Sequence, residues 1–222
     1  LTVSESWTED LNRLGAKRVE LITNGYDADD FEIKAKTNDK FIIGHYGLLN
    51  HLRNPKNLWK VLNSLCADNT EFNAKLEIHL SGNIDTVVIT EIESYPSLKG
   101  KIKQLGYLSH AEVLEQYNEA SVLLLLLFNS KSGVGNYPGK IFEYFAAQKP
   151  ILAFGPKGSD TENLIEKTKS GTYHVYDENS DLEEVIKNLF FQTENHDTTF
   201  NIEQYSREKL TKDLSELLNS IK

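Results

Sequence analysis

The segment "SVLLLLLFNSKSGVGNYPGKIFEYFAAQKPIL", from Ser121 to Leu152, carries the clearest fold signal in the chain. Its opening apolar run ends at Phe128 and is less than half of the about 20 residues that a membrane-spanning helix needs, so it predicts a strand buried on both faces of a parallel sheet. A glycine-rich loop, an aromatic-rich helical run and a second apolar strand follow in that order. This succession predicts a parallel βαβ unit.

The same alternation of apolar runs and amphipathic stretches extends over the whole chain. It predicts an α/β fold with a doubly wound, Rossmann-like sheet of about six parallel strands, in which ligands bind beyond the carboxyl ends of the strands. Ser109 and Glu112 have the spacing of a capping box, which predicts a helix start there. The candidate strands are 18–23, 41–46, 76–82, 102–107, 121–127, 150–155 and 172–176, and the candidate helices are 55–67, 85–94, 110–119, 139–147, 161–168 and 181–191, followed by a polar connector over 192–201 and a final helix over 202–221.

Composition and charge exclude several classes of protein. The 222 residues include 24 Lys and Arg against 33 Asp and Glu, and the net charge of -9 disfavours nucleic acid as the main partner. The single cysteine, Cys66, lies in an apolar helical pattern typical of a packed core thiol, and the six histidines lack the spacing of metal ligands. We therefore expect neither a disulfide framework nor a metal site. The chain contains no methionine, even at its start, which predicts a piece of a longer protein.

The loop after the buried strand is the strongest candidate for ligand binding. Gly133, Gly135 and Gly139 are spaced one residue too widely for the dinucleotide fingerprint, and Gly139-Lys140 is not followed by Ser or Thr as in a P-loop. Backbone amides at the following helix start can still hold a diphosphate, with Lys140 adding charge. The alternative for Lys140 and Glu143 is a surface ion pair worth about 0.2 to 0.5 kcal/mol.

A second glycine-bearing loop follows the second candidate strand. Gly44 and Gly47 flank the strand end, and Arg53 and Lys56 precede the next helix. These basic residues either form an ordinary solvated face or meet a phosphate at the same edge of the sheet. For Arg53 we predict the second outcome, in the same cleft as Lys140.

Four motifs in order give the chain a family likeness. They are the Asn-Gly-x-Asp-x-x-x-Phe pattern that ends "LTVSESWTEDLNRLGAKRVELITNGYDADDF", and the stretches "IGHYGLLNHLRNPKNL", "QLGYLSHAEVLEQYNEASVLLLL" and "YPGKIFEYFAAQKPIL". Together they resemble the C-terminal, nucleotide-binding half of retaining glycosyltransferases with the GT-B architecture, family four (glycosyl transferases group 1) in particular. The resemblance implies a Rossmann-like nucleotide-sugar-binding domain over 1–200, in which a helix at 1–14 leads in from a missing N-terminal domain, and a C-terminal helix over 201–222 packed across the surface.

The resemblance also implies roles for individual residues. Glu143 matches the second glutamate of the family's Glu-x7-Glu motif, which holds the ribose hydroxyls of the donor nucleotide. Arg53 falls where the family places a basic residue, usually lysine, on the diphosphate, and Tyr107 and Leu108 match the loop whose backbone contacts the base. The implied donor-binding set is Gly47, Arg53, Tyr107, Leu108, Gly135, Asn136, Tyr137, Gly139, Lys140 and Glu143.

Two positions depart from the family pattern. Gly135 stands where the first glutamate of the motif would contact the donor sugar, and Leu48 stands where an arginine commonly follows the loop glycine. The resemblance implies a hexosyltransferase-type enzyme that transfers a sugar from a nucleotide-diphosphate sugar to an acceptor hydroxyl, with retention and without a metal or cofactor. Its catalytic residues and acceptor site lie largely in the missing half, so this chain alone should bind donor and transfer little.

Two alternatives stay open. A GT-B-type sugar-nucleotide 2-epimerase shares the nucleotide half, but it needs acidic and histidine residues around the sugar, and Gly135 offers none. A degenerate, non-catalytic nucleotide-binding module is the other alternative, because the first glutamate is lost. For the transferase we expect a bacterial protein in the cytoplasm, free or at the inner face of the membrane, that reaches a glycan or lipid-linked acceptor through the missing domain during glycan biosynthesis.

Overall fold

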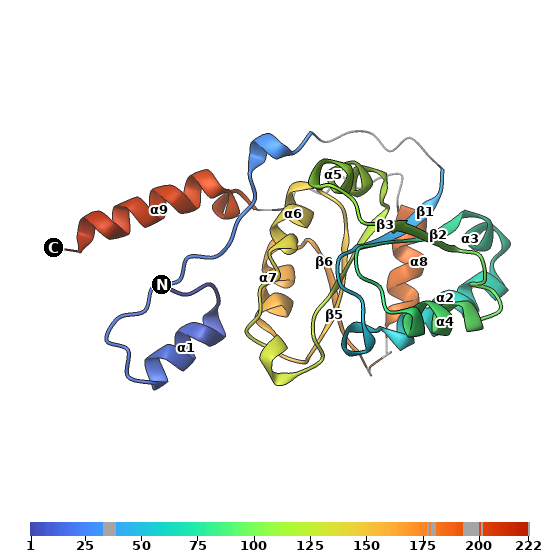
Figure 1. Cartoon of the computed structure of the whole chain (residues 1–222), viewed down its shortest axis with the longest axis horizontal. Helices are drawn as coiled ribbons and strands as arrows, with labels where there is room; N and C mark the ends of the chain where they lie inside the picture. The colour runs from blue at the N-terminus through green and yellow to red at the C-terminus, as the bar shows by residue number, and fades with distance from the viewer. Residues whose placement is uncertain (33–38, 177, 179–180, 193–199, 201, 222) are drawn as a thin grey trace.

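The computed structural model describes residues 1–32, 39–176, 178, 181–192, 200 and 202–221, and its centre is a six-stranded sheet (Figure 1). The strands are β1 (Phe41–Tyr46), β2 (Leu76–Ser81), β3 (Ile102–Gly106), β4 (Val122–Leu126), β5 (Ile151–Gly155) and β6 (Gly171–Val175). Every neighbouring pair is parallel, and the order is β3-β2-β1-β4-β5-β6. The predicted doubly wound α/β fold is therefore confirmed. The order reverses between β1 and β4, and such a reversal is where ligands bind in sheets of this kind.

Helices cover both faces of the sheet (Figure 1). Those on one face are α2 (Lys56–Asp68), α3 (Thr70–Lys75), α4 (Thr86–Ser94) and α8 (Leu182–Gln192), and those on the other are α5 (His110–Glu119), α6 (Lys140–Ala146) and α7 (Asp160–Thr168). Neighbouring residues of β1 separate between two cores, because side chains alternate along a strand. Phe41 and Ile43 pack with the first group of helices, and Ile42 packs with the second.

Two helices lie outside these layers. Neither α1 (Glu5–Arg13) nor α9 (Arg207–Ser220) has a buried residue, and Figure 1 shows α9 extending away from the sheet. The final helix predicted over 202–221 is divided, because η4 (Glu203–Tyr205) comes first and Ser206 then caps α9. Of the helices in the described part of the chain, none combines the length and the apolarity needed to cross a membrane.

Two further local predictions concern α5 and α2, and both are confirmed. At the start of α5, the Ser109 amide donates to the Glu112 carboxylate at 2.7 Å and the Glu112 amide donates to the Ser109 hydroxyl at 3.4 Å, which forms the capping box. Cys66 is buried in α2, where burial raises the pKa of its thiol to about 11. The thiol is therefore part of the core.

Other local predictions are wrong. Residues 18–23 do not form a strand: a single bridge joins Leu21 to Thr2, because the segment lies outside the sheet, whose edge strands are β3 and β6. Helix α3 is absent from the prediction, because six residues are too few for an amphipathic period to show. In the structure, Asn69 caps this helix and the buried side chain of Phe72 packs it against the core. The connector predicted over 192–201 falls almost entirely outside the described residues.

Candidate functional site

The carboxyl ends of β1 and β2 meet at two glycines. The Gly47 amide donates to the Ser81 carbonyl at 2.8 Å, and Gly82 packs against Gly47. A Cβ at Gly82 would lie 2.6 Å from the Gly47 carbonyl oxygen, and the φ angles of Gly82 and Gly47 are +103° and +149°. Other residue types would be strained at both positions, so the pair fixes the path of the chain beyond β1.

Lys140, the first residue of α6, places its ammonium group at the end of β1. Nζ donates a hydrogen bond to the Tyr46 carbonyl at 2.5 Å, and a Cβ at Gly47 would lie 2.2 Å from Nζ. Burial and, to a lesser extent, the nearby charge of Arg53 lower the pKa of Lys140 to about 8, although the charge of Glu143 opposes the shift. The ammonium group therefore lies at the sheet edge and not on a solvated helix face.

Arg53, the last residue of η2 (His51–Arg53), belongs to the same group of charges. Its guanidinium carbon lies 3.8 Å from the centroid of the Phe128 ring, beyond the end of β4. Its Nε is buried and makes no hydrogen bond to any residue that the structure describes. Burial also lowers the pKa of the Arg53 guanidinium. The structure thus brings the two predicted phosphate-binding cations close enough together for one to shift the pKa of the other.

Neither of these two cations is paired with a carboxylate from the part of the chain that the structure describes. Over the described ranges of the chain, no Asp or Glu oxygen lies within 4.0 Å of either Lys140 or Arg53. The surface ion pair considered for Lys140 and Glu143 is therefore not formed. Lys56, the other basic residue of that loop, pairs with Glu91 at 3.6 Å instead. Partly desolvated cations that are not paired with a carboxylate favour an anionic ligand.

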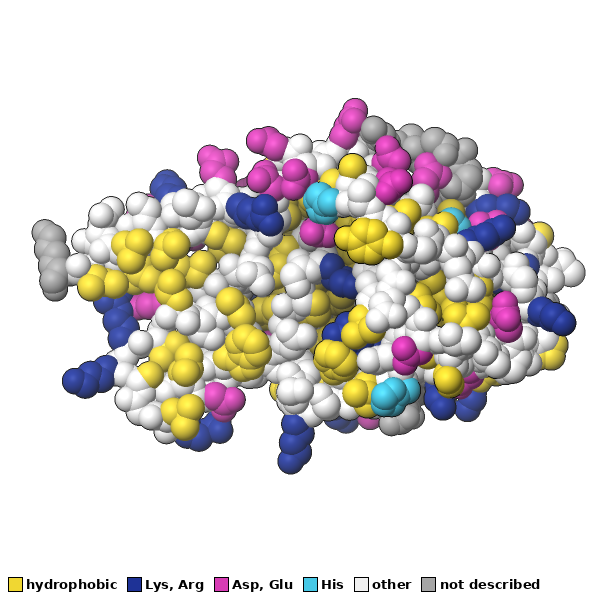
Figure 2. All heavy atoms as spheres, viewed as in Figure 1, with side chains coloured by type: hydrophobic (Ala, Val, Ile, Leu, Met, Phe, Trp, Pro, Cys, Tyr) yellow, Lys and Arg dark blue, Asp and Glu magenta, His cyan; other side chains and the backbone are white. Residues whose placement is uncertain are grey.

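The distribution of charge on the surface supports the same conclusion. Figure 2 shows acidic side chains crowded along one edge of the molecule, over the region of η1 (Ala28–Asp30) and α5, with basic side chains in the middle of the same face. The net charge of -9 therefore does not extend evenly over this face. A local positive potential can attract an anion to a protein that is acidic overall.

His45, which is fully buried in β1, adds a neutral ring beneath these charges. Its Nδ1 lies 3.0 Å from the Leu124 carbonyl and its Nε2 lies 3.2 Å from the Leu48 carbonyl. Burial lowers the pKa of His45 to about 3, and the charges of Lys140 and Arg53 contribute to the shift. The positive charge at neutral pH therefore resides on the lysine and the arginine. Nothing in the spacing of the histidines points to this position.

Glu143 lies one turn into α6 and is held by a buried tyrosine. The Tyr117 hydroxyl donates to the Glu143 carboxylate at 2.9 Å. The Tyr117 ring packs edge-on against Tyr46 and Tyr144, with 5.2 Å between ring centroids in each case. Burial strongly raises the pKa of Tyr117, so it stays a donor. Tyr117 thus orients one oxygen of the carboxylate, a role that the sequence pattern does not reveal.

The glycine loop at 133–139 is packed at its start and open at its end. A Cβ at Gly133 would lie 2.2 Å from the Phe128 carbonyl, and one at Gly135 would lie 2.7 Å from both Cδ1 and Nε1 of Trp7. Gly139 is exposed, with no atom within 4 Å of its Cβ position. Of these three glycines, Gly139 is therefore the one that a ligand can approach freely.

Two other predicted residues of this loop make hydrogen bonds to neighbouring helices. The Asn136 carbonyl accepts a hydrogen bond from the Thr161 hydroxyl at 2.8 Å, at the start of α7. Tyr137 is buried, and its hydroxyl donates to Glu5 of α1 at 2.5 Å. Their contacts hold the loop in place.

Beyond β3, the predicted base-binding loop presents an aromatic side chain. Tyr107 is 93% exposed and Leu108 is half-buried. The Gly106 carbonyl accepts a hydrogen bond from the Gly82 amide at 2.9 Å, which joins this loop to the edge where Gly47 lies. The Tyr107 ring is therefore free to stack on a planar ligand at the same edge of the sheet.

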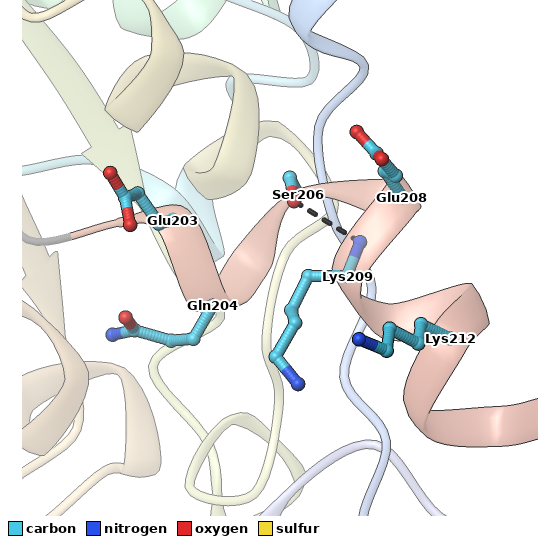
Figure 3. Close-up of a pocket in the computed structure, with 6 residues that line it drawn as sticks. All are labelled: Glu203, Gln204, Ser206, Glu208, Lys209 and Lys212. Atoms are coloured by element: carbon cyan, nitrogen blue, oxygen red, sulfur yellow. Dashed lines mark hydrogen bonds between the residues drawn. The ribbon is translucent and has the colours of Figure 1, made fainter. Parts of the chain in front are cut away.

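A pocket of about 560 Å³ lies elsewhere, at the start of α9 (Figure 3). It is lined by Glu203, Gln204, Ser206, Glu208, Lys209 and Lys212. The dashed line in Figure 3 marks the cap of α9, in which the Lys209 amide donates to the Ser206 hydroxyl at 3.2 Å. None of the predicted donor-binding residues lines this pocket, so it is distinct from the candidate site.

Comparison with solved structures identifies the fold. Lipopolysaccharide outer core galactosyltransferase WaaB is similar with a TM-score of 0.66 at 12% identity, over 99% of this chain and 61% of that one. TarM from S. aureus, in a complex that includes UDP, gives a TM-score of 0.65 at 18% identity, over 98% of this chain and 43% of that one. A Listeria monocytogenes protein described as a UDP-N-acetylglucosamine 2-epimerase gives 0.61 at 12% identity, over 98% of this chain and 58% of that one.

The fold is that of the C-terminal half of GT-B glycosyltransferases, as the sequence motifs implied. The chain spans between 43% and 61% of the length of these three structures. No model of a protein family and no curated protein matches its sequence.

Proposed function

We propose that this chain is the donor-binding domain of a glycosyltransferase of the hexosyltransferase type. The observation that carries the proposal is the pair of partly desolvated cations, Lys140 and Arg53, at the point where the strand order reverses. A nucleotide-diphosphate sugar supplies the negative charge that these groups lack. The role of the whole protein would be transfer to an acceptor hydroxyl with retention, and the chain alone should bind donor and transfer little.

Lys140 and Arg53 would stabilise the leaving diphosphate during transfer. As the bond between sugar and phosphate breaks, negative charge grows on the phosphate oxygens, and preorganised cations are most effective where charge develops. Two such groups can serve this role without a metal ion. Glu143 would accept the ribose hydroxyls through the carboxylate oxygen that Tyr117 leaves free, and Tyr107 would stack on the base.

We place the enzyme in the cytoplasm of a bacterium, free or peripherally bound at the inner face of the membrane, where glycan or lipid-linked acceptors are assembled. The acceptor would be held by a second domain outside this chain. The catalytic groups that contact the acceptor would come from the same domain.

A thermal-shift screen tests donor binding directly. UDP, GDP and ADP, each alone and as a sugar nucleotide, are added at millimolar concentration to the chain. A ligand at 100 times its Kd stabilises by about 2.7 kcal/mol, which for a chain of this length corresponds to roughly 5 to 10 °C in Tm. We expect such a shift with one base. If none of the nucleotides stabilises the folded chain, the proposed function is wrong.

The similarity to the Listeria structure keeps an epimerase in consideration. An epimerase and a transferase both bind the sugar nucleotide, so binding does not separate them. Incubation of the full-length protein with the preferred sugar nucleotide, without acceptor, separates the two activities. An epimerase converts the sugar, whereas a transferase leaves it unchanged until an acceptor is added. A full-length protein that binds and does neither would be a degenerate nucleotide-binding module.

Arg53→Ala should weaken nucleotide binding moderately. The variant removes a cation that stacks on Phe128, and we expect a loss of roughly 5- to 12-fold in affinity, equivalent to about 1 to 1.5 kcal/mol. Calorimetric titration of the preferred nucleoside diphosphate measures it. Lys56→Ala is the matched control, because Lys56 pairs with Glu91 and should not alter binding. Equal affinities for Arg53→Ala and the original chain would remove Arg53 from the site.

Donor affinity should also depend on pH through Lys140. An anion binds the ammonium form of Lys140 better than the neutral amine. Since the pKa of Lys140 in the ligand-free protein is about 8, affinity should be constant near pH 6 to 7 and fall as pH rises above 8. Between pH 7 and pH 9 we expect a loss of roughly 10-fold. A sugar nucleotide is the suitable probe, because its phosphates do not titrate in this range. A flat profile over pH 7 to 9 would show that Lys140 does not meet the diphosphate.

A further inference from the structure

Helix α1 is docked on the glycine loop through its first turn. The Ser6 amide and hydroxyl donate to the two oxygens of the Asp160 carboxylate, at 2.9 and 2.7 Å. Asp160 is buried at the start of α7, and its own amide donates to the Val134 carbonyl at 2.8 Å. The bond from Tyr137 to Glu5 adds a third connection. The start of α1, the loop and α7 therefore hold one another in place.

Trp7 follows these contacts in the first turn of α1, and much of the residue is exposed to solvent. Its Cδ1 and Nε1 fill the space next to Gly135 that a larger residue would need. Trp7 is nevertheless 42% exposed, and its Nε1 makes no hydrogen bond to any residue in the described ranges. A fixed aromatic body with a free N–H group at the surface is suited to contact with a ligand that has both apolar and hydroxyl groups.

We propose that Trp7 forms a wall of the donor-sugar subsite and contributes to the choice of sugar. This inference rests on the proposed function. Trp7 covers the loop at Gly135, and this loop leads to Lys140, the first residue of α6. In the proposed arrangement, a sugar joined to a diphosphate at Lys140 would lie against the part of the loop that Trp7 covers. The C–H face of a sugar ring packs on an indole, and the Nε1 group donates to a sugar hydroxyl. The base and the ribose do not depend on this contact.

Trp7→Ala separates this role from a merely structural one. The probes are the tightest-binding compound among UDP-glucose, UDP-galactose, UDP-N-acetylglucosamine, GDP-mannose and ADP-glucose, and the matching bare diphosphate. We expect Trp7→Ala to lower the affinity for the sugar nucleotide roughly 5- to 20-fold and to change the affinity for the bare diphosphate less than 2-fold. Trp7→Phe keeps an aromatic face and should restore most of the affinity. Leu11→Ala, on the same helix and 37% exposed in the original chain, is the matched control and should change neither.

Three results would overturn the inference. Equal affinity of Trp7→Ala and the original chain for the sugar nucleotide removes Trp7 from the subsite. An equal loss for sugar nucleotide and bare diphosphate, in a variant that unfolds at an unchanged temperature, shows that Trp7 only positions the loop. Failure of the original chain to bind any of these sugar nucleotides or bare diphosphates would instead contradict the proposed function, and the inference with it, which distinguishes the two failures.

Discussion

Lys140→Met should stabilise the free chain while it removes most of its affinity for nucleotide diphosphates. In the free protein the ammonium group is partly desolvated beside Arg53, and its pKa falls from 10.5 to about 8. Each pKa unit corresponds to about 1.4 kcal/mol, so the charged lysine lowers the free energy of unfolding by about 3 kcal/mol at neutral pH. The remaining contact of the ammonium group with solvent makes the actual loss smaller. The hydrogen bond to the Tyr46 carbonyl contributes only about 0.5 to 1.5 kcal/mol to the free energy of unfolding.

The expected gain in the free energy of unfolding is about 1 to 2 kcal/mol, or roughly 2 to 8 °C in Tm. Loss of a charge-assisted contact to phosphate should lower affinity roughly 10- to 150-fold. Denaturant unfolding and calorimetric titration measure the two effects on the same sample. Lys103→Met replaces an exposed lysine of β3 and should alter neither. A Lys140→Met chain that binds like the original would contradict the assigned phosphate role.

Glu143→Gln should lower nucleotide affinity by a similar factor with little change in stability. A carboxylate that accepts two ribose hydroxyls contributes about 1.5 to 3 kcal/mol, so we expect a loss of roughly 10- to 150-fold. The glutamine oxygen can still accept the hydrogen bond from Tyr117. Because Glu143 raises the pKa of Lys140, the pH at which affinity falls should also move below 8 in this variant.

Glu143→Ala is the less selective substitution. It leaves the buried hydroxyl of Tyr117 without its partner, and an unsatisfied buried hydroxyl costs about 1 to 3 kcal/mol. Adding Tyr117→Phe removes that hydroxyl and should recover most of the lost stability without recovering affinity. Glu115→Gln, an exposed residue of α5, is the control. Unchanged nucleotide affinity in folded Glu143→Gln would show that the carboxylate does not hold the ribose.

The sequence predicts the sheet and the meeting of Lys140 and Arg53 because both follow from local patterns. Apolar runs identify the strands, and parallel strands bring the loops at their carboxyl ends to one edge, whatever their separation along the chain. Glycine spacing and basic residues then mark the two loops that matter. The exact partner of each charge does not follow in this way, which is why Lys56 and Arg53 look equivalent in the sequence and are not.

The residues that the sequence does not reveal act through tertiary contacts. Tyr117 is one aromatic residue on an amphipathic helix until α5 and α6 come together and place it beside Glu143. Trp7 and Gly135 have no common pattern, and only the docking of α1 shows that a larger residue at that point of the loop would meet the Trp7 side chain. The strand predicted at 18–23 does not form for a related reason: strand propensity is local, whereas a strand also needs a sheet edge with which to pair.

The strand order has a consequence for synthesis on the ribosome. β1 lies in the middle of the sheet, yet its second neighbour, β4, follows 79 residues later, as the hydrogen bond from the Ile42 amide to Ser121 illustrates. At about 5 to 20 residues per second, the open edge of β1 waits roughly 4 to 16 s for its partner. All six residues of β1 are buried in the finished fold. An unpaired apolar edge is a template for aggregation, so the reversal of strand order that creates the candidate site also exposes the nascent chain to aggregation during that interval.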